Sequence, residues 1–389
     1  MQRRRVMLIV ETSLIYGREV LRGINRYVVA NEPWSIYVDL RELVVRPPAW
    51  LDSWDGDGII TRSTTPNLAE KLKALHIHTV DLTDIYGDQG LLHIGTDHEA
   101  VGHSAAEHLL ERGFRNFAFC GFTGHNWSSR RKDGFRNVVE NSGYQLLDFE
   151  SPWDTTLAQT WEEQQALLCQ WLEKLPRPIG IMACNDMRGQ HLLDACRRVE
   201  YAVPEEVAVI GVDNDELVCE LCDPPLSSVM PNPQRIGYEA AALLDRLMNG
   251  EKIEPKSILI EPIGVETRQS TDVLAIDDPL VAQAVKYIRH HACDGISVNN
   301  VLKEVPVSRS ILERRFRKYI GRSPQSEIRS VQLKRVKQLL RETDLPLDRI
   351  ATLAGYEHPE YMSVVFKRVL GETPGQYRSK NPNSSTGKQ

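Results

Sequence analysis

Two nine-residue stretches near the end of the chain repeat one pattern of basic, apolar and turn-forming residues. They are "FRKYIGRSP" at 316–324 and "FKRVLGETP" at 366–374. In each, a phenylalanine precedes two basic residues, an aliphatic residue, a glycine, a hydroxyl residue and a proline. Each stretch ends a segment that contains a short helical run, a break and a second amphipathic helix. Such a pair of helices is a helix-turn-helix unit, whose second helix enters a DNA major groove.

The first predicted recognition helix separates a buried stripe from a charged face. Ser308 is placed to begin the helix as its N-cap. Leu312, Phe316 and Tyr319 follow at the i, i+4 and i+7 spacing of one helix face. The opposite face carries side chains that can bond to bases or phosphates: Arg309, Ser310, Glu313, Arg314 and Arg317. We therefore predict that this face contacts DNA.

The second predicted recognition helix has the same plan with fewer base-reading groups. Met362, Phe366 and Val369 form its predicted buried stripe. Its outward positions are Glu360, Ser363, Val364 and Lys367. A long helix over 324–343 separates the two units and is expected to act as a rigid spacer. Because the second face has few hydrogen-bond donors, we expect it to position the protein more than to read sequence.

The charge of the chain is divided unequally between its two parts. Residues 1–278 hold 27 Lys and Arg against 43 Asp and Glu, whereas residues 279–389 hold 20 against 10. A net charge of −16 is thus followed by a net charge of +10. Basic side chains displace counterions from polyanions, of which nucleic acid is the commonest in cytoplasm. The division indicates that the C-terminal part binds nucleic acid.

The first 270 residues alternate between short β-rich runs and amphipathic helical runs. "RRVMLIVE" and "GDGIIT" are typical of buried strands, and "YGREVLRGINRYVVAN" is typical of a helix. The alternation predicts an α/β fold with parallel sheets and helices on both faces. Ligands of such sheets bind beyond the carboxyl ends of the strands, so polar residues that follow a strand are the site candidates. No Gly-x-Gly-x-x-Gly follows the first strand, which argues against a dinucleotide cofactor.

Secretion and membrane insertion are disfavoured by the apolar runs of the chain. The run Val6–Val10 ends at Glu11, which makes it too short for a signal peptide. No run is long enough to span a membrane. The seven cysteines are odd in number and mostly scattered, which fits reduced thiols better than a disulfide framework. We therefore expect a cytoplasmic protein.

An enzyme is the main alternative from another functional class, and the sequence gives it little support. We find no hydrolase elbow, P-loop or zinc-protease motif, and predict no catalytic residue and no cofactor. His98, His103 and His108 do not keep one helix face. Cys219 and Cys222 form half of a zinc motif without a second pair, so buried free thiols are expected there. We predict no metal site.

Residues 279–378 resemble the DNA-binding domain of the AraC/XylS family, most clearly over "RSVQLKRVKQLLRETDLPLDRIATLAGYEHPEYMSVVFKRVLGETPGQYR". The resemblance implies major-groove contacts at Ser310, Glu313 and Arg314. In the second recognition helix it implies such contacts at Pro359, Glu360, Ser363 and Val364. Arg314 can pair with guanine in bidentate fashion, and either glutamate can accept from cytosine N4. Pro306 stands where the family often has glycine, so an altered turn is expected.

Residues 5–268 resemble the sensor fold shared by LacI-type repressors and periplasmic binding proteins, without the N-terminal DNA-binding helices. The likeness is carried by "HIGTDHEAVGHSAAEHLLERGFRNFAFCGF", "GIMACND" and "VPEEVAVIGVDNDELVCELCDPPLSSV". It implies two similar lobes around a cleft that closes on a small molecule. It places the family's sugar-contacting positions on Arg131, Asn185 and Asp213.

Further residues near predicted strand-to-helix turns are candidates for the same site: Tyr16, Arg18, Trp127 and Asp186. Carboxylates, amides and guanidinium groups bond sugar hydroxyls in pairs, and an indole ring stacks on the apolar face of a sugar. As alternatives, Asn185 and Asp186 are placed to cap the next helix, and Asp213 to close a turn. As a set at the ends of separate strands, these residues favour ligand binding.

A LacI-like sensor followed by an AraC-like module is an order similar to that of regulators of xylose catabolism. We place the sensor at 1–268, a linker at 269–278, the DNA-binding domain at 279–380 and a disordered tail at 381–389. The resemblance implies D-xylose as effector, a homodimer on paired DNA half-sites, activation with RNA polymerase as partner, and no membrane. Physical chemistry alone supports only a small polar ligand. Repression, another pentose or hexose, a sugar-processing enzyme and a transport binding protein stay open as alternatives.

Overall fold

The computed structural model describes residues 3–31, 33–41, 49–62, 64–153, 160–254, 257–273 and 278–380. The tail expected at 381–389 lies outside these residues. The chain divides into two units. The first comprises Met1–Glu107 with Asn116–Asp272, and the second comprises His108–Arg115 with Val273–Gln389.

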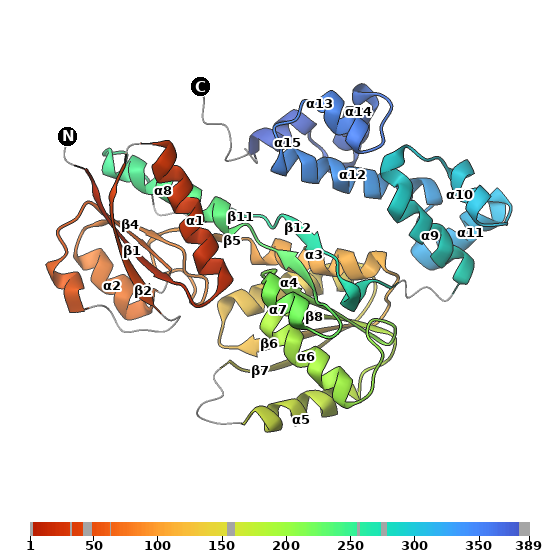
Figure 1. The fold of residues 1–389 in the computed structure, drawn as a ribbon, viewed down its shortest axis with the longest axis horizontal. Coiled ribbons are helices and arrows are strands. Elements are labelled where there is room, and N and C mark those ends of the chain that lie inside the picture. Colours follow the sequence, from red (N-terminus) through yellow and green to blue (C-terminus); the bar gives the residue numbers. More distant parts are fainter. Residues whose placement is uncertain are drawn as a thin grey trace. The chain divides into compact units, whose positions relative to one another are not determined.

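Lobe 1 of the first unit is a parallel sheet with helices on both faces (Figure 1). In order across the sheet, its strands are β11 (Ser257–Ile260), β5 (Leu92–Thr96), β4 (His78–Asp81), β3 (Gly58–Thr61), β1 (Arg5–Glu11) and β2 (Ser35–Arg41). One face packs against α1 (Ile15–Ala30) and α8 (Pro233–Met248). The other face packs against α2 (Pro66–Ala74) and the short 3-10 helix η1 (Ala49–Ser53). Burial on both faces explains the nearly continuous apolar runs of the strands.

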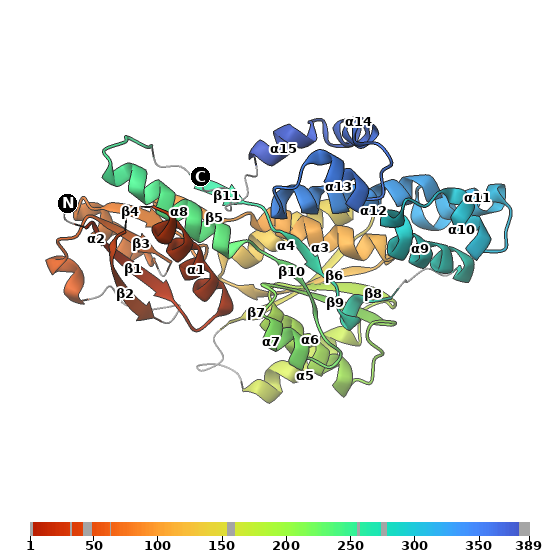
Figure 2. The same ribbon diagram turned by 45° about the horizontal axis from the view of Figure 1, so that its top comes forward.

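Helices α1 and α8 lie side by side although they are far apart in the sequence (Figures 1 and 2). A Cβ atom at Gly23 would lie 2.0 Å from the carbonyl oxygen of Gln234, and one at Gly237 would lie 2.0 Å from that of Val20. Glycine at both positions therefore permits the close approach of the two backbones. Lobe 1 is completed by a helix that the chain forms after passing through lobe 2.

Lobe 2 repeats the plan of lobe 1. In order, its strands are β12 (Gly264–Glu266), β10 (Ser227–Met230), β9 (Val207–Val212), β8 (Ile179–Ala183), β6 (Phe117–Thr123) and β7 (Leu146–Pro152). All neighbours are parallel except β10 and β12. One face packs against α3 (His98–Glu111) and α4 (Asn126–Asn141). The other packs against α5 (Trp161–Leu172), α6 (Asp186–Arg198) and α7 (Glu216–Leu221) (Figure 2).

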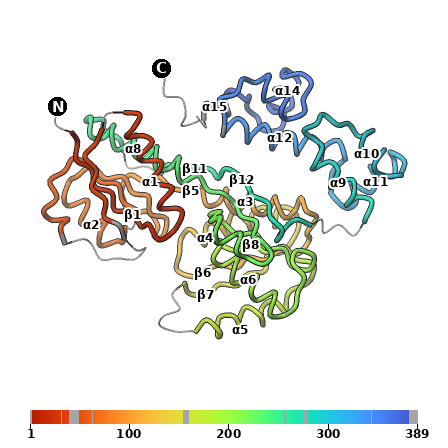
Figure 3. Tube along the Cα trace, in the orientation of Figure 1, coloured from red at the N-terminus to blue at the C-terminus, as the bar shows by residue number. Residues whose placement is uncertain are grey.

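The chain crosses between the lobes after β5, after β10 and after β11, a path that Figure 3 traces. These crossings make the carboxyl ends of the strands in both sheets face a common cleft. The α/β fold with parallel sheets is thus confirmed, and the crevice lies where a doubly wound sheet places its ligands. None of the helices in the described ranges is both long and apolar enough to cross a membrane.

The second unit is helical, and one long helix joins its two halves (Figure 1). Its α-helices are α9 (Pro279–His291), α10 (Val298–Glu304), α11 (Arg309–Ile320), α12 (Pro324–Glu342), α13 (Leu347–Leu353), α14 (Pro359–Leu370) and α15 (Pro374–Lys380). One core gathers α9, α10, α11 and the start of α12, and another gathers the rest of α12 with α13, α14 and α15. Between the cores, Gln332 donates to the carbonyl oxygens of Ala292 and Gly355 at 3.1 and 3.0 Å. The spacer helix is therefore part of both helix-turn-helix units.

The repeated nine-residue pattern marks the end of one helix and the cap of the next. Gly321 and Gly371 end α11 and α14 with a left-handed φ of 77°, which glycine adopts without strain. Ser323 Oγ then accepts from the backbone N–H of Ser326, at 3.2 Å. Thr373 Oγ1 accepts in the same way from Gln376, at 3.2 Å. The repeat is thus a stop signal followed by a start signal.

Two predicted details are different in the structure. Val369 is 60% exposed, and the buried residues of α14 are Met362, Val365 and Phe366. Val369 lies in the last turn, where Leu370 makes the contact with the core instead. The segment Gln269–Thr271, expected in the linker, forms the 3-10 helix η2 and packs inside lobe 2. There the hydroxyls of Ser270 and Thr271 are buried and bond to Ser227, at 2.8 and 2.7 Å.

Candidate effector site and DNA-binding surface

A cavity of about 90 Å³ lies in the cleft between the two lobes. From lobe 1 it is lined by Leu14, Tyr16, Arg62, Asp84 and Ile85. From lobe 2 it is lined by His98, His125, Trp127, Arg131, Trp153, Asn185 and Asp213. Guanidinium, carboxylate and amide groups here stand beside aromatic rings. This combination suits a small polar ligand with apolar faces.

Arg131 of α4 is held by partners from three other elements. Its side chain is 3% exposed. Its Nε donates to Nδ1 of His98 at 3.2 Å, one terminal nitrogen donates to the carbonyl of Cys184 at 2.5 Å, and the other donates to Asp213 Oδ1 at 3.2 Å. The guanidinium also lies 5.0 Å from the centre of the Trp127 ring. These contacts fix the position of the charge.

A second arginine, which is partly buried, lines the cavity from lobe 1. Arg62 directly follows β3 and forms an ion pair with Glu11, whose side chain is fully buried. Burial raises the pKa of Glu11, although the charge of Arg62 opposes the shift. The Arg62 guanidinium lies 4.3 Å from the centre of the Tyr16 ring, which allows a cation–π contact. Gly17 leaves space for the Glu11 carboxylate, because a Cβ at position 17 would lie 2.6 Å from Glu11 Oε1.

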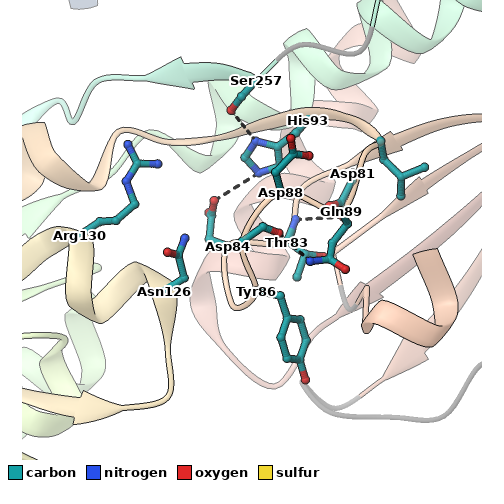
Figure 4. Close-up of a pocket in the computed structure, with 12 residues that line it drawn as sticks. Asp81, Thr83, Asp84, Tyr86, Asp88, Gln89, His93, Asn126, Arg130 and Ser257 are labelled. Atoms are coloured by element: carbon teal, nitrogen blue, oxygen red, sulfur yellow. Dashed lines mark hydrogen bonds and ion pairs between the residues drawn. The ribbon is translucent and has the colours of Figure 1, made fainter. Parts of the chain in front are cut away.

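Asp84, in the loop after β4, connects lobe 1 to the first residue of α3. Its Oδ1 lies 3.3 Å from Nε2 of His93, and its Oδ2 lies 3.3 Å from Nε2 of His98. Burial opposes ionisation, but the two histidines hold the pKa of this carboxyl well below its usual value. Nδ1 of His93 bonds to Ser257 Oγ of β11 at 2.9 Å (Figure 4). The carboxylate is therefore oriented by residues of both lobes.

A second cavity, of about 250 Å³, shares Asp84 with the first (Figure 4). Several of its polar groups bond to other groups of the protein. Asp81 Oδ1 accepts from Thr64 Oγ1 at 2.6 Å and from the backbone N–H of Thr83 at 3.1 Å. Arg130 pairs with Glu99 at 3.2 Å. We assign no ligand to this cavity, because Asp81 and Arg130 are already bonded inside the protein.

Aromatic rings form one wall of the first cavity. The rings of Trp127 and Trp153 are 5.9 Å apart and nearly perpendicular, at 89°. His125 lies 5.5 Å from each of them. Indole faces in this arrangement can cover the C–H groups of a sugar ring while the opposite wall bonds its hydroxyls.

Asp186 lies beneath the turn that presents Asp213. Its carboxylate accepts from Ser228 Oγ at 2.6 Å and from the backbone N–H of Asp215 at 2.8 Å. Asp213 and Asn214 have φ values of 104° and 48°, a region that is uncommon for residues other than glycine, although asparagine and aspartate tolerate it best. The bonds to Asp186 help to hold this turn. Burial, followed by the charge of Asp213, raises the pKa of Asp186 to about 8.

The outward face of α11 carries the residues predicted to contact DNA. Some of them are bonded to other protein groups and others are not. Arg309 Nε pairs with Glu313 Oε1 at 3.2 Å, and Ser310 bonds to the hydroxyl of the N-cap Ser308. In the part of the chain that the structure describes, the guanidinium groups of Arg314 and Arg317 have no hydrogen-bond or ion-pair partner. Arg315, beside them, pairs instead with Asp278, the N-cap of α9, at 2.9 Å, and so has a structural role.

The outward face of α14 is more apolar. Val364 is 53% exposed and Tyr361 is 50% exposed. The Tyr361 hydroxyl accepts from Arg329 of α12 at 2.9 Å. Ser363 is occupied by a bond to the carbonyl of Pro359 at 2.9 Å. This face therefore offers fewer free donors to base edges than α11 does.

Metal ligation has no structural support in the residues the structure describes. Among them, no group of three or more His, Cys, Asp or Glu side chains is arranged to hold a metal ion. The cysteines are free, and Cys219 and Cys222 are both buried.

The sequence matches family models along most of its length. They describe a XylR N-terminal domain at residues 5–92, a periplasmic binding protein-like domain at 106–271 and a helix-turn-helix domain at 301–380. The xylose operon regulatory protein of Haemophilus influenzae is 37% identical over 96% of this chain and 98% of its own length. The chain belongs to the family of xylose operon regulatory proteins. The family member of Escherichia coli is 34% identical, over 98% of both chains.

Solved structures agree with this assignment. A structure described as the xylose-binding transcription activator XylR is 34% identical and covers 98% of this chain and 99% of its own, with a TM-score of 0.64. The lac repressor dimer bound to operator covers 69% of this chain at 16% identity, with a TM-score of 0.56, and shows a likeness of fold. The chain is thus a DNA-binding transcription regulator, and both resemblances found in the sequence are confirmed.

In this xylose operon regulator, the cavity gathers part of the predicted effector site. The predicted residues that line it are Tyr16, Trp127, Arg131, Asn185 and Asp213. Arg18 does not line it, because its exposed guanidinium donates to the carbonyls of Thr12 and Ser13 at 2.7 and 3.0 Å. Asp186 does not line it either, because its side chain is directed beneath the Asp213 turn.

Several lining residues were missed by reasoning from the sequence: Arg62, Asp84, His98, His125 and Trp153. Arg62 follows β3 and Asp84 follows β4 closely, so the rule that selects polar residues after strands would have found both. The spacing of His98, His103 and His108 addresses only metal ligation, so it does not point to the cleft. Trp153 follows β7, whose sequence "LLDFESP" gives a weak strand signal.

Proposed function

We propose that this regulator binds D-xylose between its lobes and, in response, activates transcription of genes for xylose use. The observation that carries the proposal is the likeness over nearly the full chain to a structure described as a xylose-binding transcription activator, at 34% identity. The cavity supports it, because its charged pairs and aromatic wall provide the chemistry of a sugar site.

Sugar hydroxyls act as both donors and acceptors, and the cavity offers both partners. Arg131 can donate to a hydroxyl oxygen while Asp213, its neighbour at 3.2 Å, accepts from the hydroxyl hydrogen. Asn185 already accepts from the backbone N–H of Arg188 at 2.9 Å, which leaves its amide nitrogen to donate to a ligand. Arg62 supplies the same chemistry from lobe 1. A sugar bonded from both lobes favours the closed cleft over the open one.

On the DNA side, we propose that α11 reads bases and that α14 mainly positions the protein. Arg314 has no competing partner among the described residues, which supports the proposal that it bonds guanine. Glu313 can accept from cytosine, and it also restrains Arg309. The other proposed contacts, to phosphates or base edges, are Ser310, Arg317, Pro359, Glu360, Ser363 and Lys367. Val364 offers an exposed apolar surface that suits a thymine methyl group.

The output we propose is activation by a homodimer on paired half-sites, in contact with RNA polymerase, in the cytoplasm. In the domain division we propose, the sensor includes Gln269–Thr271, and the DNA-binding domain spans 279–380. Sugar binding can change the affinity for DNA only by as much as the affinity for the sugar differs between the two DNA-binding states.

A sugar panel tests this function on the full-length protein. Calorimetry with D-xylose, L-arabinose and D-glucose should show tightest binding of D-xylose. Fluorescence anisotropy with the promoter DNA beside its gene should show that the same sugar increases DNA affinity. If none of the sugars binds, the proposed sensor function is wrong. If another sugar binds more tightly than D-xylose, that sugar is the better candidate for the effector. A decrease in promoter output with D-xylose would indicate repression, and conversion of D-xylose to another compound on incubation would indicate an enzyme.

A further inference from the structure

We infer that His98 is a positioning residue, which holds the sugar-contacting guanidinium of Arg131 in place and ties it to Asp84 of the opposite lobe. The inference rests on the proposed sugar site. It goes beyond that site because His98 acts through Arg131 rather than through a bond of its own to the sugar. It assigns the loop after β4 a part in setting the shape of the lobe 2 wall.

His98 is the first residue of α3, directly after the chain has crossed from lobe 1. Its side chain is 2% exposed, so each ring nitrogen needs a partner inside the protein. Nδ1 lies 3.2 Å from Nε of Arg131, and Nε2 lies 3.3 Å from Oδ2 of Asp84. An arginine Nε–H can only donate, so Nδ1 must accept. The ring hydrogen is therefore on Nε2, which faces the Asp84 carboxylate at ion-pair distance without the alignment of a hydrogen bond.

The other contacts of Arg131 restrain only the terminal nitrogens of the guanidinium and leave Nε without a partner. Its two terminal nitrogens donate to the carbonyl of Cys184 and to Asp213, both in lobe 2. These bonds hold one end of the planar group. The bond from Nε to His98 holds the other end and prevents rotation about the side-chain axis. Without an acceptor at this place, the buried Nε–H loses its partner.

Backbone hydrogen bonds also connect the loop after β4 in lobe 1 with lobe 2. The carbonyl of Asp84 accepts from the N–H of Trp127 at 3.2 Å, and the carbonyl of Ile85 accepts from the N–H of Asn126 at 3.0 Å. Both N–H groups belong to the first turn of α4, the helix that carries Arg131. The loop of lobe 1 therefore holds α4 through its backbone and Arg131 through His98. A movement of this loop is transmitted to the effector-binding charge.

Two substitutions separate the two contacts of the ring. His98→Asn retains an acceptor near the position of Nδ1 and loses the contact at Nε2. His98→Gln retains a donor near the position of Nε2 and loses the acceptor for Arg131. We expect His98→Gln to weaken D-xylose binding by roughly tenfold, and His98→Asn to keep affinity within about threefold of the wild type. Calorimetry on the full-length protein measures both. The control is His103→Asn, which changes an exposed histidine of the same helix and should leave the affinity unchanged.

The pH dependence of D-xylose affinity distinguishes a positioning role of His98 from a purely structural one, because a purely structural role would leave this dependence unchanged. Protonation of His98 places a hydrogen on Nδ1, where it opposes the Nε–H of Arg131. Burial lowers the pKa of His98, so this loss occurs below the ordinary range of a histidine. The charged groups that face the ring are Asp84, Arg131 and Asp213. His98→Asn retains all three, so the loss of affinity at acid pH should be smaller in this variant than in the wild type.

The results distinguish this inference from the function on which it rests. If the wild type binds no sugar, the proposed function is wrong. If the wild type binds D-xylose and both variants bind it as tightly as the wild type does, His98 does not position Arg131. Equal weakening in both variants, with an equal loss of thermal stability in the sugar-free protein, would also overturn the inference, because it would show a structural role alone.

Discussion

Arg131 in the cleft and Arg314 on the first recognition helix carry the same guanidinium group in opposite surroundings. Arg131 is 3% exposed and donates to His98, to the carbonyl of Cys184 and to Asp213. Arg314 is exposed and has no bonded partner in the described part of the chain. Both are proposed to contact a polar ligand, but one is already bonded within the protein and the other is exposed to solvent.

The difference follows from the ligand that each arginine has to recognise. A small sugar cannot organise a buried charge, so the protein has to supply the partners and the geometry beforehand. DNA carries its own negative charges, and binding to it releases counterions. A solvated arginine can therefore wait without partners until a phosphate or a guanine replaces the water. Loss of the buried charge should damage both fold and binding, whereas loss of the solvated charge should damage binding alone.

Arg131→Ala is expected to have the largest effect. It leaves Asp213 and the Nδ1 atom of His98 without their partner, so D-xylose affinity should fall by at least roughly 100-fold. The free energy of unfolding should fall by about 3 kcal/mol, at the lower end for a broken buried pair because Asp213 is partly exposed. Calorimetry and denaturant unfolding measure these changes. Arg130→Ala, on the same helix but paired with Glu99 outside the cavity, is the control. Normal sugar binding by Arg131→Ala would place the effector site elsewhere.

Arg314→Ala should come next, with a loss of roughly 1–3 kcal/mol in the free energy of specific DNA binding. Stability should stay unchanged, because no bond inside the described protein is broken. Selection of binding sites from random DNA should show a relaxed preference at one base position. Lys318→Ala removes a charge from the same helix and should retain the base preferences. An unchanged base preference in the sites selected by Arg314→Ala would show that Arg314 does not contact a base.

Asp186→Asn tests whether a buried carboxyl beneath the site affects stability. The pKa of Asp186 is raised to about 8 by burial and by Asp213, so the folded state keeps its proton where the unfolded state has lost it. This contribution to stability is complete at low pH and is lost as the pH rises toward about 8. Between pH 7 and 8.5, the wild type should lose roughly 1 kcal/mol more in the free energy of unfolding than the variant. Asp194→Asn, on the same helix but partly exposed, should follow the wild type. Parallel curves for wild type and Asp186→Asn would refute the assignment.

Lys367→Ala should have the smallest effect. Lys367 is exposed at the end of α14, where a phosphate contact is the expected role. DNA affinity should fall by a similar factor on all sequences. The slope of log affinity against log salt should decrease by about 0.9. A fluorescence titration at several salt concentrations measures the slope, and an unchanged slope would show that Lys367 does not meet a phosphate.

The DNA-binding half was the more predictable part of the molecule. Its helices, the glycine stops at Gly321 and Gly371 and the outward face of α11 depend on residues within a few positions of each other. The error at Val369 occurs in the last turn, where local spacing no longer reports which residue meets the core. Arg315 shows the same limit, because its partner Asp278 is far away in the sequence.

A family resemblance, rather than local spacing, indicated Arg131, Asn185 and Asp213 as site residues. The sequence by itself determined the α/β alternation, the charge division and the two helix-turn-helix units. These features depend on composition and on short-range spacing, which the chain carries without folding. Only the tertiary structure decided that Arg62 and Asp84 complete the cleft, that Arg18 is outside it and that His98 links Asp84 to Arg131. Strand ends from two sheets meet only after the chain has crossed between the lobes three times, and burial and hydrogen-bond partners are set by that packing.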